Sequence, residues 1–173
     1  ETIAWLVGVV QGDGHVNKYF VEISDEHFEN IMVVAGAVER LGLKPKVTRD
    51  KSERRYRLWI CNKKFADLMK TYGAHDKIHP ANVEPIYHRS YIRGLYDAEG
   101  SCEFWRKRNM IRINFSNKSP YIVNFVSQYL IGYGSDPMSG IRQKRIEFRY
   151  TEKMMWKISW RKLDLIFQPR LRN

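Results

Sequence analysis

Residues 6–14 read LVGVVQGDG and residues 92–100 read IRGLYDAEG, and the two stretches are copies of one pattern. Each copy is an apolar helical segment with small residues four apart, and each ends in a carboxylate followed by glycine. The copies begin at residues 6 and 92 of a 173-residue chain, about half its length apart. A repeat on this scale predicts two similar lobes around a shared axis.

The small residues indicate how the two segments pack. Gly8 and Gly12 share one face of the first helix, and Gly94 and Ala98 occupy the same positions in the second. Small residues let two helix backbones approach closely. We also expect a left-handed glycine just past each helix end, at Gly14 and at the equivalent residue 100.

The terminal acid of each motif is a candidate metal ligand. Two helices packed side by side would bring Asp13 and Glu99 together at one end. Close carboxylates repel each other and need a cation between them, and oxygen-only ligation favours magnesium or calcium over zinc. The alternative is two unrelated core helices with ordinary glycine caps.

Charge is strong and segregated by element. Lys and Arg number 30 against 19 Asp and Glu, which gives a net charge of +11. The basic residues concentrate in 44–57 and 142–149, which read as strands, whereas acids gather in 25–41, which reads as a helix. This distribution predicts a nucleic-acid-binding surface on a sheet. The alternative is simply a soluble basic protein.

Hydrophobic alternation and capping residues predict the same order of elements twice. In the first half we expect a helix over 3–11, strands over 15–17 and 19–24, a helix capped by Ser24 and stopped by Gly42, strands over 45–49 and 55–61, and a helix from Asn62 to about Tyr72. In the second half we expect a helix over 86–97, strands over 103–107 and 110–116, a helix from Asn117 to about Gly132, strands over 145–150 and 154–159, and a helix over 161–167. The predicted boundaries are an N-terminal lobe over 1–79, a linker over 80–85 and a C-terminal lobe over 86–173.

Each predicted strand pair has one apolar face and one face of basic or amide side chains. Ile113 and Phe115, for example, are expected to face inward and Asn114 outward. A β-ribbon fits the DNA major groove, where Arg reads guanine and Asn or Gln reads adenine. The base-reading candidates are Glu22, Arg55, Arg57, Glu103, Arg112, Asn114, Arg142, Gln143, Arg145, Glu147, Arg149 and Lys157. The turn residues Lys51, Arg54 and Lys153 are expected to meet phosphates, and any one of these side chains taken singly could simply be solvated.

The two motifs resemble those of the LAGLIDADG homing endonucleases, specifically the single-chain type with two motifs. The matching residues are Leu6, Gly8, Asp13 and Gly14 in the first copy and Gly94, Leu95, Asp97, Ala98 and Gly100 in the second, with Glu99 where the family also accepts glutamate. The departures are Val7, Gln11, Gly12, Arg93 and Tyr96, and none removes a terminal acid. The resemblance covers nearly the whole chain. It implies an α+β fold of two pseudo-symmetric αββαββα lobes, whose antiparallel sheets form a concave DNA-binding saddle and whose motif helices pack at the lobe interface.

The resemblance also implies metal-dependent phosphodiester hydrolysis. Asp13 and Glu99 would be catalytic metal ligands, helped by nearby backbone carbonyls and the scissile phosphates. Mg²⁺ is the expected cation, with Ca²⁺ or Mn²⁺ able to take its place. The family often carries a water-ordering amide after the second strand of each hairpin, and the matching catalytic candidates are Asn117 and Asp25. Asp25 departs from the amide and could instead only cap a helix.

A basic residue beyond the last helix of each lobe acts on the scissile phosphate or its water in the family. Lys77 is the matching catalytic candidate in the first lobe, and Arg170 is a weak one in the second. The alternative is that Lys77 is just a linker lysine.

The leading interpretation is a site-specific double-strand DNA endonuclease. The alternatives are an RNA-splicing maturase on the same scaffold, a DNA-binding protein without cleavage, and a basic ribosome-associated protein. Both motif acids are present, which favours the nuclease. One chain would supply both half-sites, so we expect a monomer that needs no protein partner. Because no apolar run reaches spanning length and no secretory signal is evident, we expect no membrane partner and an intracellular location, in a prokaryotic cytoplasm or nucleoid or in an organelle.

Overall fold

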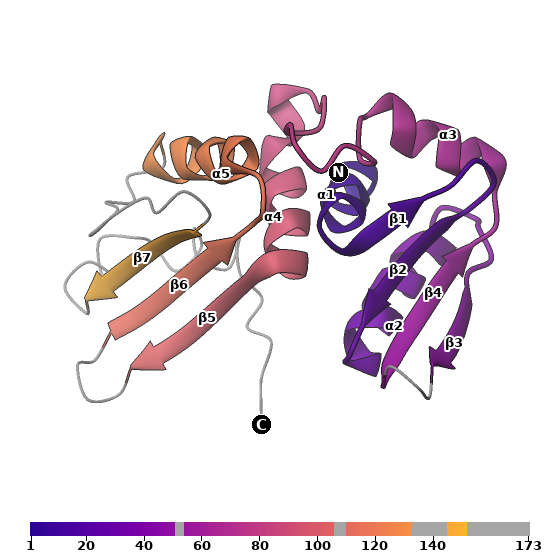
Figure 1. Ribbon diagram of the computed structural model, residues 1–173, viewed down its shortest axis with the longest axis horizontal. Coiled ribbons are helices and arrows are strands. Elements are labelled where there is room, and N and C mark those ends of the chain that lie inside the picture. The colour runs from indigo at the N-terminus through magenta and orange to yellow at the C-terminus, as the bar shows by residue number, and fades with distance from the viewer. Residues whose placement is uncertain (51–53, 106–109, 133–144, 152–173) are drawn as a thin grey trace. The chain divides into compact units, whose positions relative to one another are not determined.

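The computed structural model describes residues 1–50, 54–105, 110–132 and 145–151 (Figure 1). For residues 104–105, 110–112 and 145–151 it describes the backbone alone. The chain divides into two compact units, Glu1–Ala98 and Glu99–Asn173. The predicted strand over 154–159 and helix over 161–167 lie outside the described residues. In the part of the chain that is described, no helix is long and apolar enough to cross a membrane.

The first unit has the predicted order of elements. These are α1 (Thr2–Asp13), β1 (Gly14–Val16), β2 (Val21–Asp25), α2 (Phe28–Glu39), β3 (Lys46–Asp50), β4 (Arg55–Ile60), α3 (Lys63–Thr71), the 3₁₀ turn η1 (Pro85–Tyr87) and most of α4 (His88–Glu99). Asn62 caps α3 as predicted, because its Oδ1 accepts a hydrogen bond from the Phe65 amide at 3.0 Å.

The core of this unit lies on one face of its four-stranded sheet. The strand order is β1-β2-β4-β3 and every pairing is antiparallel. Val21, Ile23, Leu58 and Ile60 are at most 2% exposed, and α1 and α2 both pack on β2. Because side chains alternate along a strand, the residues between these apolar ones lie on the opposite, polar face.

The two motif helices, α1 and α4, pack directly against each other through Gly8 and Gly94. A Cβ built on Gly8 would collide with the carbonyl oxygen of Tyr91 and lie 2.7 Å from the amide nitrogen of Leu95. A Cβ built on Gly94 would collide with the carbonyl oxygen of Trp5 and lie 2.9 Å from the amide nitrogen of Val9. Each glycine therefore fits into the same backbone notch of the other helix, as twofold-related elements do. The predicted close packing of the motif helices is confirmed.

The motif glycine at position 14 does not adopt the predicted conformation. Gly14 has φ −94° and ψ 161°, which is extended, and it begins β1. Glycine is required at this position for a steric reason, because a Cβ there would lie 2.7 Å from the carbonyl oxygen of Val10. Gly100 likewise begins a strand, and the described glycines with positive φ are Gly42 and Gly73. The left-handed glycines thus follow α2, where Gly42 stops the helix as predicted, and α3, and the prediction for the motif glycines is wrong.

Two predicted helix caps are also wrong. Ser24 does not cap α2, whose N-cap is His27; the side chain that reaches its amide, at 2.7 Å, is that of Asp25. In the second lobe the cap is Ser119, whose Oγ accepts from the amide of residue 122 at 3.3 Å, whereas Asn117 accepts from the Ser119 amide at 2.9 Å. In both lobes a polar residue at the end of the second strand, Asp25 or Asn117, accepts a hydrogen bond from the backbone amide two residues later, just before the helix begins.

The second unit repeats the hairpin and its register. Its described elements are β5 (Gly100–Trp105), β6 (Met110–Ser116), α5 (Pro120–Gly132) and β7 (Arg145–Thr151), in a sheet of order β5-β6-β7. In the first unit the motif glycine Gly14 pairs with Ile23 of β2. In the second unit Gly100 pairs with the equivalent residue of β6, Phe115. The predicted α+β class and the repeated antiparallel hairpins are confirmed.

The repeat and the packing divide the chain at different places. The boundaries predicted at 79 and 86 follow the repeat, whereas the compact units meet between Ala98 and Glu99. The difference arises because α4 belongs to the second repeat but packs against α1. The lobe boundaries themselves stay a prediction.

Candidate functional site

Helix α1 ends at Asp13, and the ammonium group of Lys77 caps the carbonyl oxygens at that end. Asp13 is the last residue of the helix and its side chain is exposed. Nζ of Lys77 donates hydrogen bonds to the carbonyl oxygens of Val10 at 2.9 Å, Gln11 at 2.7 Å, Gly12 at 3.4 Å and Gly14 at 2.7 Å. The carbonyls at a helix C-terminus lack partners within the helix and carry partial negative charge, which favours a cation. The resemblance implies carbonyls of this region as metal ligands, and here they accept from Lys77.

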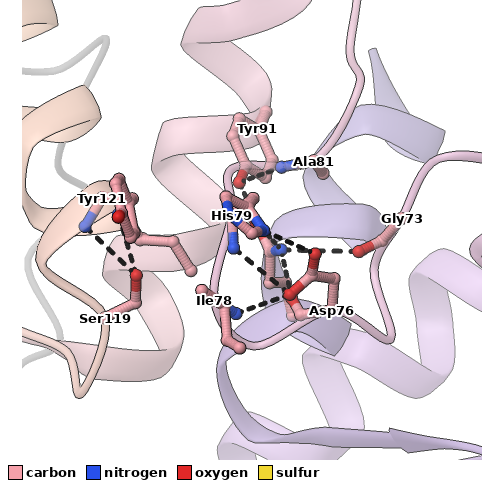
Figure 2. Close-up of polar contacts among 10 residues, drawn as sticks. Gly73, Asp76, Ile78, His79, Ala81, Tyr91, Ser119 and Tyr121 are labelled. Atoms are coloured by element: carbon pink, nitrogen blue, oxygen red, sulfur yellow. Dashed lines mark hydrogen bonds and ion pairs between the residues drawn. The ribbon is translucent and has the colours of Figure 1, made fainter.

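The connector that carries Lys77 is held to both motif helices by a buried glutamine. Gln11 is 1% exposed, and its Nε2 donates to the carbonyl oxygens of Asp76 at 2.6 Å and His79 at 2.8 Å. Its Oε1 accepts a hydrogen bond from the hydroxyl of Tyr91 on α4, which in turn accepts from the amide of Ala81 at 2.9 Å (Figure 2). Burial raises the pKa of Tyr91 above its usual range, so the hydroxyl remains a donor at neutral pH.

Asp76 shapes the turn that presents Lys77. Its Oδ1 accepts from the amides of Ile78 at 2.6 Å and His79 at 3.2 Å, and its Oδ2 lies 3.0 Å from Nδ1 of His79 (Figure 2). The hydrogen bond from the Ile78 amide, followed by that from the His79 side chain, lowers the pKa of Asp76. A depressed carboxyl pKa stabilises the turn above the unfolded pKa, and this contribution is lost as the pH falls through the folded value.

In the second unit the structure brings two predicted site residues together. Glu99 ends α4, is half-buried, and its Oε1 accepts a hydrogen bond from Nδ2 of Asn117 at 3.3 Å. Asp25 is the equivalent residue in the first unit, and its Oδ2 accepts from Nδ2 of Asn30 at 2.8 Å. Asp25 thus bonds to the start of α2, whereas Asn117 bonds to its motif acid.

The polar face of the first sheet carries an acid–arginine–acid group. Arg57 on β4 donates from Nη1 to Oε1 of Glu22 on β2 at 3.0 Å and from Nη2 to Oδ2 of Asp50 on β3 at 2.9 Å. Arg55 and Arg54 are exposed, the latter with φ +54° in the β3–β4 turn. Both η nitrogens of Arg57 are therefore engaged by carboxylates, an arrangement that the sequence did not predict.

The remaining candidates lie in the second unit or outside the described residues. Glu103 is exposed and pairs in register with Arg112, which pairs with Arg149. Asn114 alternates with the buried Ile113 and Phe115 as predicted, but it is only 7% exposed and pairs in register with Ser101 and Glu147. The register also pairs Ser116 with Arg145. The candidates outside the described residues are Lys51, Arg142, Gln143, Lys153, Lys157 and Arg170.

Both motif acids are oxygen donors. Asp13 and Glu99 are carboxylates, and Asn117 adds an amide beside Glu99. A carboxylate suits a hard divalent cation such as Mg²⁺, which is commonly held by one or two carboxylates together with water and substrate phosphates. Among the described residues there is no group of three or more His, Cys, Asp or Glu that could hold a metal. Each motif acid taken by itself fits a cation that also takes ligands from water and phosphate.

The repeated hairpins, the reciprocal glycines and a terminal acid on each motif helix agree with a family comparison. A model of the LAGLIDADG-like domain matches residues 1–72 and 87–152, so it covers both repeats. The chain belongs to the LAGLIDADG-like domain family. None of the curated proteins matches the sequence.

Solved LAGLIDADG structures share the fold at low sequence identity. The homing endonuclease I-DmoI in complex with DNA and Mn is 20% identical, with a TM-score of 0.60 and coverage of 98% of both chains. The N-terminal LAGLIDADG domain of WhiA is 15% identical, with a TM-score of 0.59, and the match covers 98% of this chain and 83% of that domain. Full-length WhiA from Thermatoga maritima is 14% identical, with a TM-score of 0.64, and this chain spans 56% of its length. At these identities the likeness shows the fold alone.

Two residues of this LAGLIDADG chain that sequence reasoning passed over organise the site. Gln11 and Tyr91 are buried polar residues on the motif helices, and they join α1, α4 and the connector. A signal was present, because Gln11 departs from the family pattern at the motif position where the second copy keeps an aspartate, Asp97. The predicted meeting of Asp13 and Glu99 and the catalytic role of Lys77 stay predictions.

We expect Lys77→Met to destabilise the protein by about 1–2 kcal/mol, since the end of α1 would lose its cation and its carbonyls would lose charge-assisted hydrogen bonds. Urea unfolding measures this as a lower midpoint at unchanged slope. Lys64→Met is the matched control, because Lys64 is exposed on α3 with no hydrogen bond or ion pair described for it. Equal midpoints for the two variants would show that Lys77 does not close the helix in solution.

Proposed function

We propose that this LAGLIDADG protein is a site-specific double-strand DNA endonuclease that hydrolyses phosphodiester bonds with a divalent cation, Mg²⁺ in the first instance. The observation that carries the proposal is the placement of the two motif acids. Asp13 and Glu99 each end a motif helix five residues after the glycine through which the helices pack. The net charge of +11 supports double-stranded DNA as the partner, and LAGLIDADG relatives include I-DmoI, solved in complex with DNA and Mn or Ca.

The chain's own groups would perform separate parts of the hydrolysis. Asp13 and Glu99 would hold the cation, and when bound it would neutralise the phosphate and stabilise the leaving oxygen. Asn117, which bonds to Glu99 and to the Ser119 amide, would orient water beside that acid. Lys77 would place a positive charge at the end of α1 and keep Asp13 in a fixed backbone frame. The exposed arginines of the sheet would contribute phosphate contacts and affinity that falls with salt.

A second candidate is a DNA-binding protein on the same scaffold that does not cleave. The specific observation in its favour is that Lys77 occupies the carbonyl oxygens at the end of α1, which are potential ligands of a cation at Asp13. In that case the ammonium group would serve in place of a metal. The two candidates share a DNA-binding surface and differ only in whether the bound strand is cut.

The test is selection of binding and cleavage from a randomised duplex library. With Mg²⁺, the endonuclease should release cut molecules that share one long sequence, and with EDTA it should retain the same sequence uncut. Binding to that sequence should weaken steeply between low and physiological salt. A sequence that is bound but never cut in Mg²⁺, Mn²⁺ or any mixture of them would establish the second candidate. Absence of any enriched duplex would refute both.

A further inference from the structure

The polar face of the first sheet contains a charged group in which one arginine is held by two carboxylates. Arg57 lies on the central strand of the three that carry the group, and it pairs in register with Ser24 on one side and Thr48 on the other. Its two η nitrogens donate to Glu22 and Asp50 at 3.0 and 2.9 Å. A bidentate contact to guanine uses the same nitrogens. Each of these nitrogens carries a second hydrogen, so to read guanine Arg57 would have to use the hydrogens that the two carboxylates leave.

Glu22 retains accepting capacity. An ionised carboxylate offers about four lone-pair sites on its two oxygens. Arg57 takes one oxygen of Glu22, Oε1, and the Glu22 side chain is 17% exposed. Trp59, directly across from Glu22 in register, is fixed by a hydrogen bond from Nε1 to Oγ1 of Thr48 at 3.1 Å and by an edge contact with the ring of Phe20. Glu22 is thus held between an arginine and an immobilised indole, as a preorganised acceptor.

We propose that Glu22, positioned by Arg57, reads the amino group of a cytosine in the major groove. This inference rests on the proposed binding of double-stranded DNA. Cytosine presents its N4 donor there, whereas guanine presents two acceptors and thymine presents the O4 acceptor and a methyl group. A carboxylate placed against an acceptor remains desolvated and unpaired, so the wrong base is penalised. Adenine is disfavoured because its N7 acceptor lies beside the N6 donor.

Arg57 acts in this scheme as a positioning residue. Glu22 and Asp50 lie on strands on either side of β4, and the guanidinium between them offsets their mutual repulsion and their repulsion from DNA phosphates. Its planar fork also fixes where each carboxylate points. The group therefore presents acceptors on a face whose other charges, such as Arg55, are basic.

The experiment compares duplex selection in EDTA by the wild type, Glu22→Gln, Arg57→Met and the control Glu39→Gln. Glu39 is exposed at the end of α2, so its variant removes the same charge away from the polar face. We expect Glu22→Gln to change the preferred base at one position from cytosine to adenine, because Gln pairs with adenine N6 and N7, with a loss of cytosine discrimination of roughly 5- to 150-fold. Arg57→Met should flatten the preference at that position, and Glu39→Gln should leave every position unchanged.

Two results would overturn the inference while leaving the proposed function in place. One is an enriched sequence whose base preferences are unchanged in Glu22→Gln. The other is a guanine preference that is lost in Arg57→Met but retained in Glu22→Gln, which would make Arg57 the reader. Circular dichroism melts of each variant separate these from loss of folding. If the wild type enriches no sequence, the proposed DNA binding fails and this inference fails with it.

Discussion

Asp13→Asn and Glu99→Gln are each expected to abolish double-strand cleavage while leaving DNA affinity intact or improved. Each change removes one of the carboxylates proposed to hold the cation, and the loss of several kcal/mol of transition-state stabilisation corresponds to at least about a hundredfold in rate. Each also removes a negative charge that would repel the DNA backbone, so binding need not suffer. Supercoiled, nicked and linear plasmid on a gel measures the cleavage, and a filter or mobility assay in EDTA measures the affinity.

The pattern of products carries further information. If each acid serves mainly one DNA strand, a single variant should accumulate nicked plasmid. If both acids share one cation, a single variant should lose cleavage of both strands together. Asp67→Asn is the matched control, because the Asp67 side chain is half-exposed on α3 and pairs only with Lys63 in the ion pairs described. Such exposed pairs contribute little to stability. Full double-strand cleavage by the Asp13→Asn, Glu99→Gln double variant would exclude the assignment of both acids.

Gly94→Ala is expected to lower the stability of the protein more than any surface change. The added methyl group would collide with the carbonyl oxygen of Trp5 and the amide of Val9, and neither backbone group can rotate away. Overpacking of a tight site costs typically 1–3 kcal/mol, and contact with backbone places this variant at the upper end, with a Tm lower by roughly 6–12 °C. Gly8→Ala should behave in the same way, since its methyl group would meet Tyr91 and Leu95.

Gly36→Ala is the control that isolates packing from helix propensity. Gly36 lies within α2, and the nearest atom to a Cβ there is the Arg40 side chain at 3.8 Å. Alanine is favoured over glycine in a helix by about 0.5–1 kcal/mol, so this variant should be slightly more stable than the wild type. Differential scanning calorimetry of the three variants checks both signs. A stable Gly94→Ala protein would mean that α1 and α4 do not pack through their glycines.

Much of the architecture follows from local patterns in the sequence. The alternation of Val21 and Ile23 with Glu22 predicted a strand with one buried face, and Asn62 predicted the start of α3. These features depend on residues within a few positions of one another, so they can be inferred without knowing the rest of the fold. The same is true of the two motifs, whose small residues predicted the close packing of α1 and α4 before any partner atoms were known.

Local patterns failed for the cap of α2 and for the conformation of the motif glycine Gly14. Ser24 and Asp25 could both cap α2, and the side chain that reaches the helix start is that of Asp25. Gly14 was predicted to be left-handed because glycine often follows a helix, yet its small size is needed for contact with Val10. In each case the residue type was informative and the local geometry decided its use.

The sequence by itself determined the repeat, the order of the described elements and the positions of the motif acids in the chain. Only the tertiary structure decided which polar groups meet. Lys77 closes α1 from 63 to 67 residues away, Gln11 bonds to a connector 62 to 68 residues away, and Arg57 finds carboxylates on both neighbouring strands. The reason is physical: periodicity records which side of an element is buried, but the partner of a charged or amide side chain depends on where the closed chain places distant atoms within about 3 Å.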